Sequence, residues 1–260
     1  MSKYALVTGA SSGIGLCYAK ELGSRGYNLF IVSIQEKELA DTAEMLRNTY
    51  GIVVHSMYMD LTRPDAADIL LRYVEDNELD LEILINNAGV FFFNNLIETP
   101  WKRVEVMLNL HIKTVTRMTQ VFGAWMAERK HGYILNMSSM SAWMAMPGIN
   151  IYNSTKAYIL NFSRSMWYEL KPHGVTVTAI CPGAIDTGLY GLAPNLRRLA
   201  VRLQVSMPPE KLVRKALKAM FRKKKSVVPG WINGPFVFLC KHVPDWVVFL
   251  LMKHITKFMK

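Results

Sequence analysis

The sequence predicts a single α/β domain built on a doubly wound parallel sheet with helices on both faces. Three observations lead to this expectation. Short apolar runs alternate with helical patterns along most of the chain, a glycine-rich turn follows the first run, and 260 residues of which 51% are hydrophobic can bury a large core. No internal repeat, low-complexity tract or linker divides the chain, so we expect residues 1–260 to form one domain.

Six apolar runs have the length and residue types of strands. They are Lys3–Val7, Leu29–Ser33, Val53–Met57, Leu81–Asn86, Tyr133–Met137 and Thr176–Cys181. Helical patterns separate them, and the first of these patterns extends to Arg25. Strands that alternate with helices pair in parallel, so their carboxyl ends meet at one edge of the sheet. Ligands of such folds bind at that edge.

The first run leads directly into a turn that contains three glycines. Glycines at this place let the backbone approach a ligand, and the N-terminus of the following helix offers free N–H groups and a positive dipole to a diphosphate. The glycine spacing is not GxGxxG, and an ordinary tight turn is the alternative interpretation. The candidate ligand-binding residues here are Thr8, Gly9, Ser11, Ser12, Gly13, Ile14 and Gly15.

Tyr152 and Lys156 stand four residues apart in a helical stretch, so their side chains share one face. An ammonium beside a phenol favours the phenolate and lowers the tyrosine pKa from its ordinary value of about 10. Such a tyrosine can donate a proton to a carbonyl oxygen or accept one from an alcohol. An exposed aromatic–lysine pair is the alternative for this spacing alone.

Together these residues resemble the classical short-chain dehydrogenase/reductase family, from Lys3 to Thr187 by motif. Its TGxxxGxG element matches Thr8–Gly15, and its NNAG element matches Asn86–Gly89. Ser139 lies thirteen residues before Tyr152, which is the family spacing for the catalytic serine. The resemblance implies a Rossmann-type domain and hydride transfer between a nicotinamide cofactor and a ketone or secondary alcohol.

The resemblance also implies the roles of four catalytic residues. Tyr152 is the general acid in reduction, and Lys156 lowers its pKa and binds the nicotinamide ribose. Ser139 donates a hydrogen bond to the substrate oxygen. Asn109 sits where the family places an asparagine that holds a water between the lysine and solvent, whereas a packing or surface role is expected for His111 beside it.

Further cofactor contacts follow from the same resemblance, and one position departs from the family pattern. Ile34, after the second strand, offers neither a carboxylate for the ribose of NAD nor an arginine for the phosphate of NADP. We expect NADP(H) to be favoured, with NAD(H) as the alternative, because no carboxylate would repel the phosphate. Beyond the turn, the expected cofactor residues are Ser33, Asp60, Leu61, Asn87, Ala88, Gly89, Tyr152, Lys156, Pro182, Gly183, Ile185 and Thr187. An N-cap role is the alternative for Asp60.

Cysteines and histidines show no metal-ligand spacing, so no metal site is expected. The three cysteines are scattered and odd in number, and no signal-peptide pattern stands at the start of the sequence. Both features favour a reducing, cytoplasmic location over a disulfide framework.

Positive charge is concentrated in the last quarter of the chain. Residues 196–260 hold 15 of the 31 Lys and Arg residues and only 2 of the 20 Asp and Glu residues. No nucleic-acid recognition motif accompanies this charge, so nucleic acid is a disfavoured partner and a solvated helix face is the plain alternative. Residues 244–260 combine an apolar run with later lysines, which predicts an amphipathic segment. It would contact a membrane surface peripherally or pack on the protein.

The end of the chain narrows the resemblance to the branch of 17β-hydroxysteroid dehydrogenases and long-chain 3-oxoacyl-CoA reductases. This implies a lipophilic ketone substrate of steroid, 3-oxoacyl or ketosphinganine type. It also implies a flap over the substrate at residues 188–206 and a homo-oligomer, either a dimer or a tetramer. The rival hypothesis is a non-catalytic scaffold that uses its basic tail to bind membranes or partners.

Overall fold

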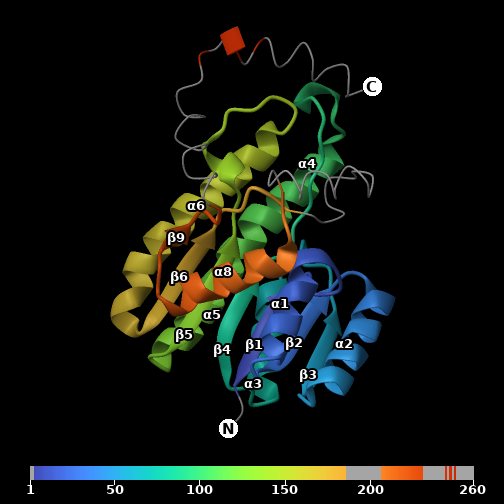
Figure 1. Cartoon of the computed structure of the whole chain (residues 1–260), viewed down its shortest axis with the longest axis vertical. Coiled ribbons are helices and arrows are strands. Elements are labelled where there is room, and N and C mark those ends of the chain that lie inside the picture. Colours follow the sequence, from blue (N-terminus) through green and yellow to red (C-terminus); the bar gives the residue numbers. More distant parts are fainter. Residues whose placement is uncertain (1–2, 186–205, 231–243, 245, 248, 250–260) are drawn as a thin grey trace.

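The computed structural model describes residues 3–185 and 206–230, together with Pro244, Trp246, Val247 and Phe249. Its centre is a seven-stranded sheet in the order β3-β2-β1-β4-β5-β6-β9, in which every strand pair is parallel (Figure 1). The strand order reverses between β1 and β4, which are direct neighbours. This arrangement confirms the predicted doubly wound α/β class.

The six predicted strands all form, with ends that shift by one residue at most. Their bounds are β1 Tyr4–Thr8, β2 Asn28–Ser33, β3 Val54–Tyr58, β4 Leu81–Asn86, β5 Gly132–Met137 and β6 Val175–Ile180. The sequence reading missed the edge strand β9, Ser226–Val227, because two residues carry no periodic signal. It also missed a separate parallel pair, β7 (Ala184–Ile185) with β8 (Ser206–Met207).

Helices cover both faces of the sheet. Their bounds are α1 Gly13–Gly23, α2 Glu36–Tyr50, α3 Ala66–Asp76, α4 Trp101–Leu108, α5 Val115–Glu128, α6 Asn150–Leu170 and α8 Pro209–Phe221. Short helical turns lie at η1 Leu96–Glu98, η3 Met140–Trp143 and η4 Lys171–His173, and a π-helical segment, η2 Asn109–Thr114, joins α4 to α5.

Successive residues of each central strand enter opposite cores because side chains alternate along a strand. In β1, Ala5 and Val7 pack in the core formed with α1, α2 and α8, whereas Leu6 packs in the core formed with α3 and α5. All three side chains are fully buried. A sheet buried on both faces explains why its strands read as continuous apolar runs.

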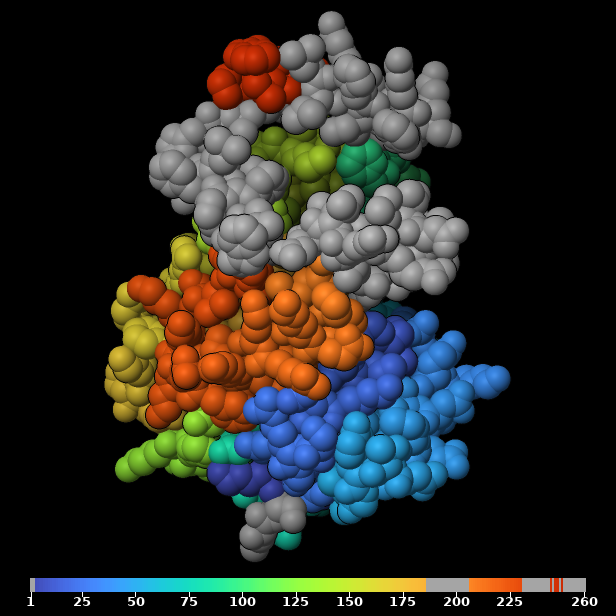
Figure 2. Space-filling model, viewed as in Figure 1, coloured from blue at the N-terminus to red at the C-terminus, as the bar shows by residue number. Residues whose placement is uncertain are grey.

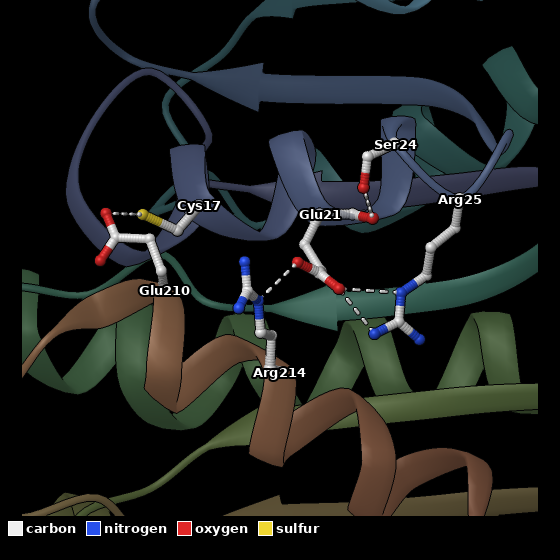
Figure 3. A network of polar contacts seen from close by, with 6 residues as sticks. All are labelled: Cys17, Glu21, Ser24, Arg25, Glu210 and Arg214. Atoms are coloured by element: carbon white, nitrogen blue, oxygen red, sulfur yellow. Dashed lines mark hydrogen bonds and ion pairs between the residues drawn. The ribbon is translucent and has the colours of Figure 1, made fainter.

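Helix α8 closes the first core by packing against α1, as the orange and blue surfaces in Figure 2 show. Its apolar face is buried, while Lys211, Arg214, Lys215 and Lys218 are exposed, which confirms a solvated basic face for this stretch. Polar contacts border the packing: Arg214 Nε lies 3.4 Å from Glu21 Oε2, and Cys17 Sγ lies 3.8 Å from Glu210 Oε1 (Figure 3). Exposed ion pairs contribute only about 0–1 kcal/mol, so the buried face holds α8 in place.

No described helix has the length and apolar character needed to cross a membrane. Most of the expected flap at 188–206, and most of the expected amphipathic segment at 244–260, lie outside the described residues.

Candidate active site

A cavity of about 640 Å³ opens at the carboxyl ends of the central strands. This volume falls in the range of small-molecule sites, and the position is the one expected of doubly wound sheets. Most of the predicted cofactor residues line it. These are Gly9, Ser11, Ser12, Gly13, Ile14, Ser33, Asp60, Leu61, Asn87, Ala88, Gly89, Tyr152, Lys156, Pro182, Gly183 and Ile185.

The glycine-rich turn depends on glycine at particular positions. Gly9 and Gly13 have φ angles of +66° and +55°, a region that L side chains rarely adopt. A Cβ atom on Gly15 would lie 2.0 Å from the carbonyl oxygen of Gly9, so only glycine lets α1 begin this close to the turn. The turn therefore leaves backbone N–H groups at the mouth of the cavity, which suits a diphosphate.

Thr8 does not line the cavity, but it holds the loop after β4 in place by hydrogen bonds. Its hydroxyl accepts hydrogen bonds of 3.0 Å from the backbone N–H groups of both Asn87 and Ala88, and donates to the carbonyl of Ile85 at 3.2 Å. The Asn87 side-chain amide donates to the carbonyl of Thr8 at 2.9 Å. These bonds fix the end of β4 to the end of β1, between which the cavity opens.

Hydroxyl and amide groups surround the end of β2. The hydroxyls of Ser11 and Ser33 lie 2.7 Å apart, and Ser11 also donates to Gln35 Oε1 at 2.8 Å. The sequence reading missed Gln35, which lines the cavity beside the exposed Ile34. Ser33, Ile34 and Gln35 carry no carboxylate, so these three side chains do not repel a phosphate.

Asp60 lines the cavity but does not cap a helix. Its carboxylate accepts hydrogen bonds from the backbone N–H and hydroxyl of Thr62, at 2.9 and 2.8 Å, which is an Asx turn. The N-cap position of α3 belongs to Asp65. The alternative N-cap reading of Asp60 is therefore wrong.

Three of the four predicted catalytic residues converge in the cavity: Ser139, Tyr152 and Lys156. Helix α6 places Tyr152 and Lys156 on its buried face, with the Lys156 Nζ atom 5.4 Å from the centre of the Tyr152 ring. Lys156 Nζ donates to the carbonyl of Met137 at 2.8 Å, and burial lowers the pKa of Lys156 to about 8. Ser139, at the N-cap of η3, accepts from the backbone N–H of Ser141 at 3.1 Å, so its own proton remains available for a ligand oxygen.

Neighbouring groups support this arrangement. The hydroxyl of Ser138 donates to the carbonyl of Lys156 at 2.7 Å, which ties the end of β5 to α6. It therefore satisfies a backbone carbonyl of α6.

The structure does not bring Asn109 to the cavity. Asn109 is half-buried at the start of η2, and His111 lines the cavity instead. Side chains two residues apart on a helix do not face the same side, so the two do not share one space. Asn109 thus lies outside the cavity lining, whereas His111, for which a packing or surface role was expected, is buried and also lines the cavity. The catalytic role of Asn109 stays a prediction. Residue types alone could not show which of the two side chains lines the cavity, because both occur within Asn109-Leu110-His111.

Thr187, the last predicted cofactor residue, lies outside the described part of the chain. Gly15 and Thr8 build the turn without lining the cavity. Among the described residues, no group of three His, Cys, Asp or Glu side chains could hold a metal ion.

The cavity fits a dinucleotide on its own geometry. At one end the glycine-rich turn offers backbone donors without side chains, and at the other Tyr152 and Lys156 face the space beside Ser139. Apolar side chains, among them Val106, Leu110 and Met137, also line the cavity. This is the arrangement of a dinucleotide-binding oxidoreductase.

Comparison with known proteins agrees. The family model for short chain dehydrogenases matches residues 3–194. The chain therefore belongs to the short-chain dehydrogenase family, whose members are nicotinamide-dependent oxidoreductases.

Curated relatives include both members of the predicted branch. The chain is 32% identical over 192 residues to very-long-chain 3-oxoacyl-CoA reductase-A of Danio rerio, covering 72% of this chain and 59% of that protein. It is 32% identical over 190 residues to 17-beta-hydroxysteroid dehydrogenase type 3 of Mus musculus, covering 72% and 61%. The chain thus spans about three fifths of the length of these relatives.

A solved short-chain dehydrogenase from Sphingobium yanoikuyae, in complex with NADPH, superposes with a TM-score of 0.79 at 29% identity. The match covers 93% of this chain and 96% of that one. The curated relatives also include an inactive hydroxysteroid dehydrogenase-like protein 1 of Homo sapiens, 28% identical over 251 residues. It covers 94% of this chain and 73% of that protein.

Proposed function

We propose that this chain reduces a lipophilic ketone to a secondary alcohol with NADPH as the favoured cofactor. The observation that carries the proposal is the convergence of Ser139, Tyr152 and Lys156 in the cavity that begins at the glycine-rich turn. When bound, the nicotinamide supplies the hydride. The protein must then hold the carbonyl and deliver a proton to its oxygen.

Each residue has one task in this scheme. The hydroxyl of Ser139 donates to the ketone oxygen and stabilises the negative charge that develops there. The phenol of Tyr152 gives that oxygen its proton. The Lys156 ammonium, held by the Met137 carbonyl, favours the phenolate that Tyr152 becomes and so eases the transfer.

The preference for NADPH rests on the end of β2. Ser11, Ser33 and Gln35 present neutral hydrogen-bonding groups there, and Ile34 presents none. None of these four side chains repels a 2′-phosphate. The similar short-chain dehydrogenase from Sphingobium yanoikuyae was solved in complex with NADPH. NADH remains the alternative cofactor because no arginine of the described residues lines this end of the cavity.

A lipophilic substrate is supported by the apolar side chains in the cavity lining and by the names of the relatives, which refer to long-chain acyl-CoA and steroid substrates. A steroid, a 3-oxoacyl thioester or a ketosphinganine would each present such a ketone. The proposal includes a cytoplasmic homo-oligomer, a dimer or tetramer, that touches membranes peripherally through residues 244–260. The exposed Trp246 and Phe249 support this contact, since 65% of each is accessible.

The test is a panel of steroid, 3-oxoacyl and ketosphinganine substrates, each assayed with NADPH and NADH by loss of reduced-nicotinamide absorbance. We expect turnover of at least one lipophilic ketone, faster with NADPH. Binding of NADPH with no turnover of any ketone would favour the scaffold alternative, which the inactive human relative makes worth testing.

A further inference from the structure

His111 is a buried titratable group of the site to which the proposed proton transfer assigns no task. Only 1% of it is exposed, and it lines the cavity from η2. Its ring centre lies 5.9 Å from that of Tyr152, with the planes at 71°. A Cβ atom added to Gly89 would lie 3.0 Å from its Nε2 atom, so the ring packs directly on the loop after β4.

Hydrogen bonds fix which nitrogen of His111 carries the proton. The backbone N–H of Val90 points to Nε2 at 3.1 Å and can only donate, so Nε2 must be the acceptor. The proton of a neutral imidazole then resides on Nδ1, which lies 2.9 Å from the hydroxyl of Thr155. Thr155 in turn donates to the backbone carbonyl of Tyr152 at 2.8 Å. All three bonds therefore run in one direction, from the loop to α6.

A charged imidazolium would break this chain, because its Nε2–H would face the N–H of Val90. The surroundings favour the neutral form. Burial and the nearby charge of Lys156 hold the pKa of His111 well below its ordinary value. The same ring is thus kept neutral by its environment and required to be neutral by its partners.

We infer that His111 is a positioning residue that joins the loop at Val90 to the turn of α6 carrying Tyr152, and thereby holds the phenol against the ketone oxygen. This inference rests on the proposed role of Tyr152. The ring of Phe91, beside Val90, also packs edge-on against that of Tyr152, with 5.0 Å between the ring centres, but a phenyl ring offers no conventional hydrogen-bonding group, whereas His111 links the two segments by hydrogen bonds.

The two bonds of His111 can be removed separately. In His111→Gln the side-chain amide reaches the place of Nε2 and can still accept from Val90, whereas in His111→Asn it reaches the place of Nδ1 and can still donate to Thr155. His111→Leu fills the site and makes neither bond. Thr155→Val removes the hydroxyl and leaves His111 unchanged.

The experiment measures kcat, the KM for the ketone and the Kd for NADPH in each folded variant of the full chain. We expect His111→Leu to lower kcat by up to about 10²-fold, the effect of a misplaced catalytic group, with little change in the ketone KM. His111→Asn should recover most of the lost kcat. Because Gly89 and Val90 line the cavity, His111→Leu should also raise the Kd for NADPH, and His111→Gln should restore this Kd but not kcat. Thr155→Val should lower kcat alone and add little to His111→Leu.

Near-wild-type kcat in Thr155→Val and in every folded His111 variant would overturn the inference. So would equal kcat in the Asn and Gln variants, which shows that the bond to Thr155 has no separate effect. Tyr152→Phe, assayed in parallel, separates the two proposals. If it is inactive while the His111 variants are normal, only the inference fails; if it retains activity, both fail.

Discussion

The ammonium of Lys156 lies 5.4 Å from the centre of the Tyr152 ring and donates a hydrogen bond of 2.8 Å to the carbonyl of Met137. The spacing of four residues along α6 places Lys156 beside Tyr152, and Met137 at the end of β5 supplies the carbonyl that accepts the hydrogen bond. A lysine held in this way cannot turn toward solvent, so its charge stays beside the phenol. The proposed chemistry depends on that charge.

The first prediction is a loss of activity at high pH. Burial lowers the pKa of Lys156 to about 8, so its ammonium is present at pH 7 and is lost as the pH rises through about 8. We expect kcat/KM for the cofactor in ketone reduction to fall across this window, since this ratio reports groups of the free enzyme. A value of kcat/KM that stays constant up to pH 10 would contradict the role assigned to the Lys156 ammonium.

The second prediction concerns cofactor choice. Ile34 is exposed at the end of β2 and neither attracts nor repels a phosphate. Ile34→Asp should shift preference toward NADH by repelling the 2′-phosphate, and Ile34→Arg should shift it toward NADPH. Ile34→Asn is the matched control, with the shape of aspartate and no charge. The ratio of kcat/KM values for the two cofactors measures the effect, and an identical ratio in all three variants would place recognition elsewhere.

Much of the fold and site is predictable from the sequence, and the exceptions have physical causes. Buried strands and glycine-rich turns leave local signals, so Ala5–Val7 and Gly9–Gly15 are found without a structure. Which residues of Asn109-Leu110-His111 face the cavity depends on helix phase, and the π-helical segment η2 sets that phase. Strand β9 and the place of Gln35 depend on distant contacts, for which a single sequence carries no signal.

The third prediction concerns stability at the amino ends of the strands, on the side of the sheet away from the cavity. Glu82 is buried at the start of β4 and accepts hydrogen bonds from Lys3 and Tyr27, at 2.6 and 2.7 Å, and contacts His131. Burial opposes its ionisation, but the bonds from His131, Lys3 and Tyr27 outweigh it and hold the pKa of Glu82 below its ordinary value. Glu82→Gln should lower the free energy of unfolding at pH 7 by about 1–3 kcal/mol.

The sign of the pH dependence follows from the lowered pKa. The stabilisation is present above the ordinary carboxyl pKa of about 4.3 and is lost as the pH falls through the lower folded-state value. The difference between wild type and Glu82→Gln in urea unfolding should therefore shrink in acid. Glu44→Gln, at an exposed position of α2, is the control and should change stability little. Equal stability of Glu82→Gln and wild type at pH 7 would refute the prediction.

The fourth prediction concerns the C-terminal segment. If residues 244–260 bind membrane surfaces, the protein should sediment with anionic vesicles at low salt and not with neutral ones. Each lysine near such a surface contributes about 1 kcal/mol, and salt screens this attraction. Truncation after Val243 should abolish sedimentation and spare reduction of a small, soluble ketone. Changing Lys253, Lys257 and Lys260 to glutamate is the matched control and should also abolish sedimentation. An insoluble truncated protein would instead indicate a packing or subunit role.

The most direct test of the proposed function is the turnover of Tyr152→Phe with NADPH and a ketone that the wild type reduces. Phenylalanine keeps the ring and removes only the proton donor, so NADPH binding and thermal stability should remain near those of the wild type. We predict that kcat falls by at least about 10²–10⁴-fold, the contribution of a general acid. A folded Tyr152→Phe variant that binds NADPH and reduces the ketone at close to the wild-type rate would contradict the account.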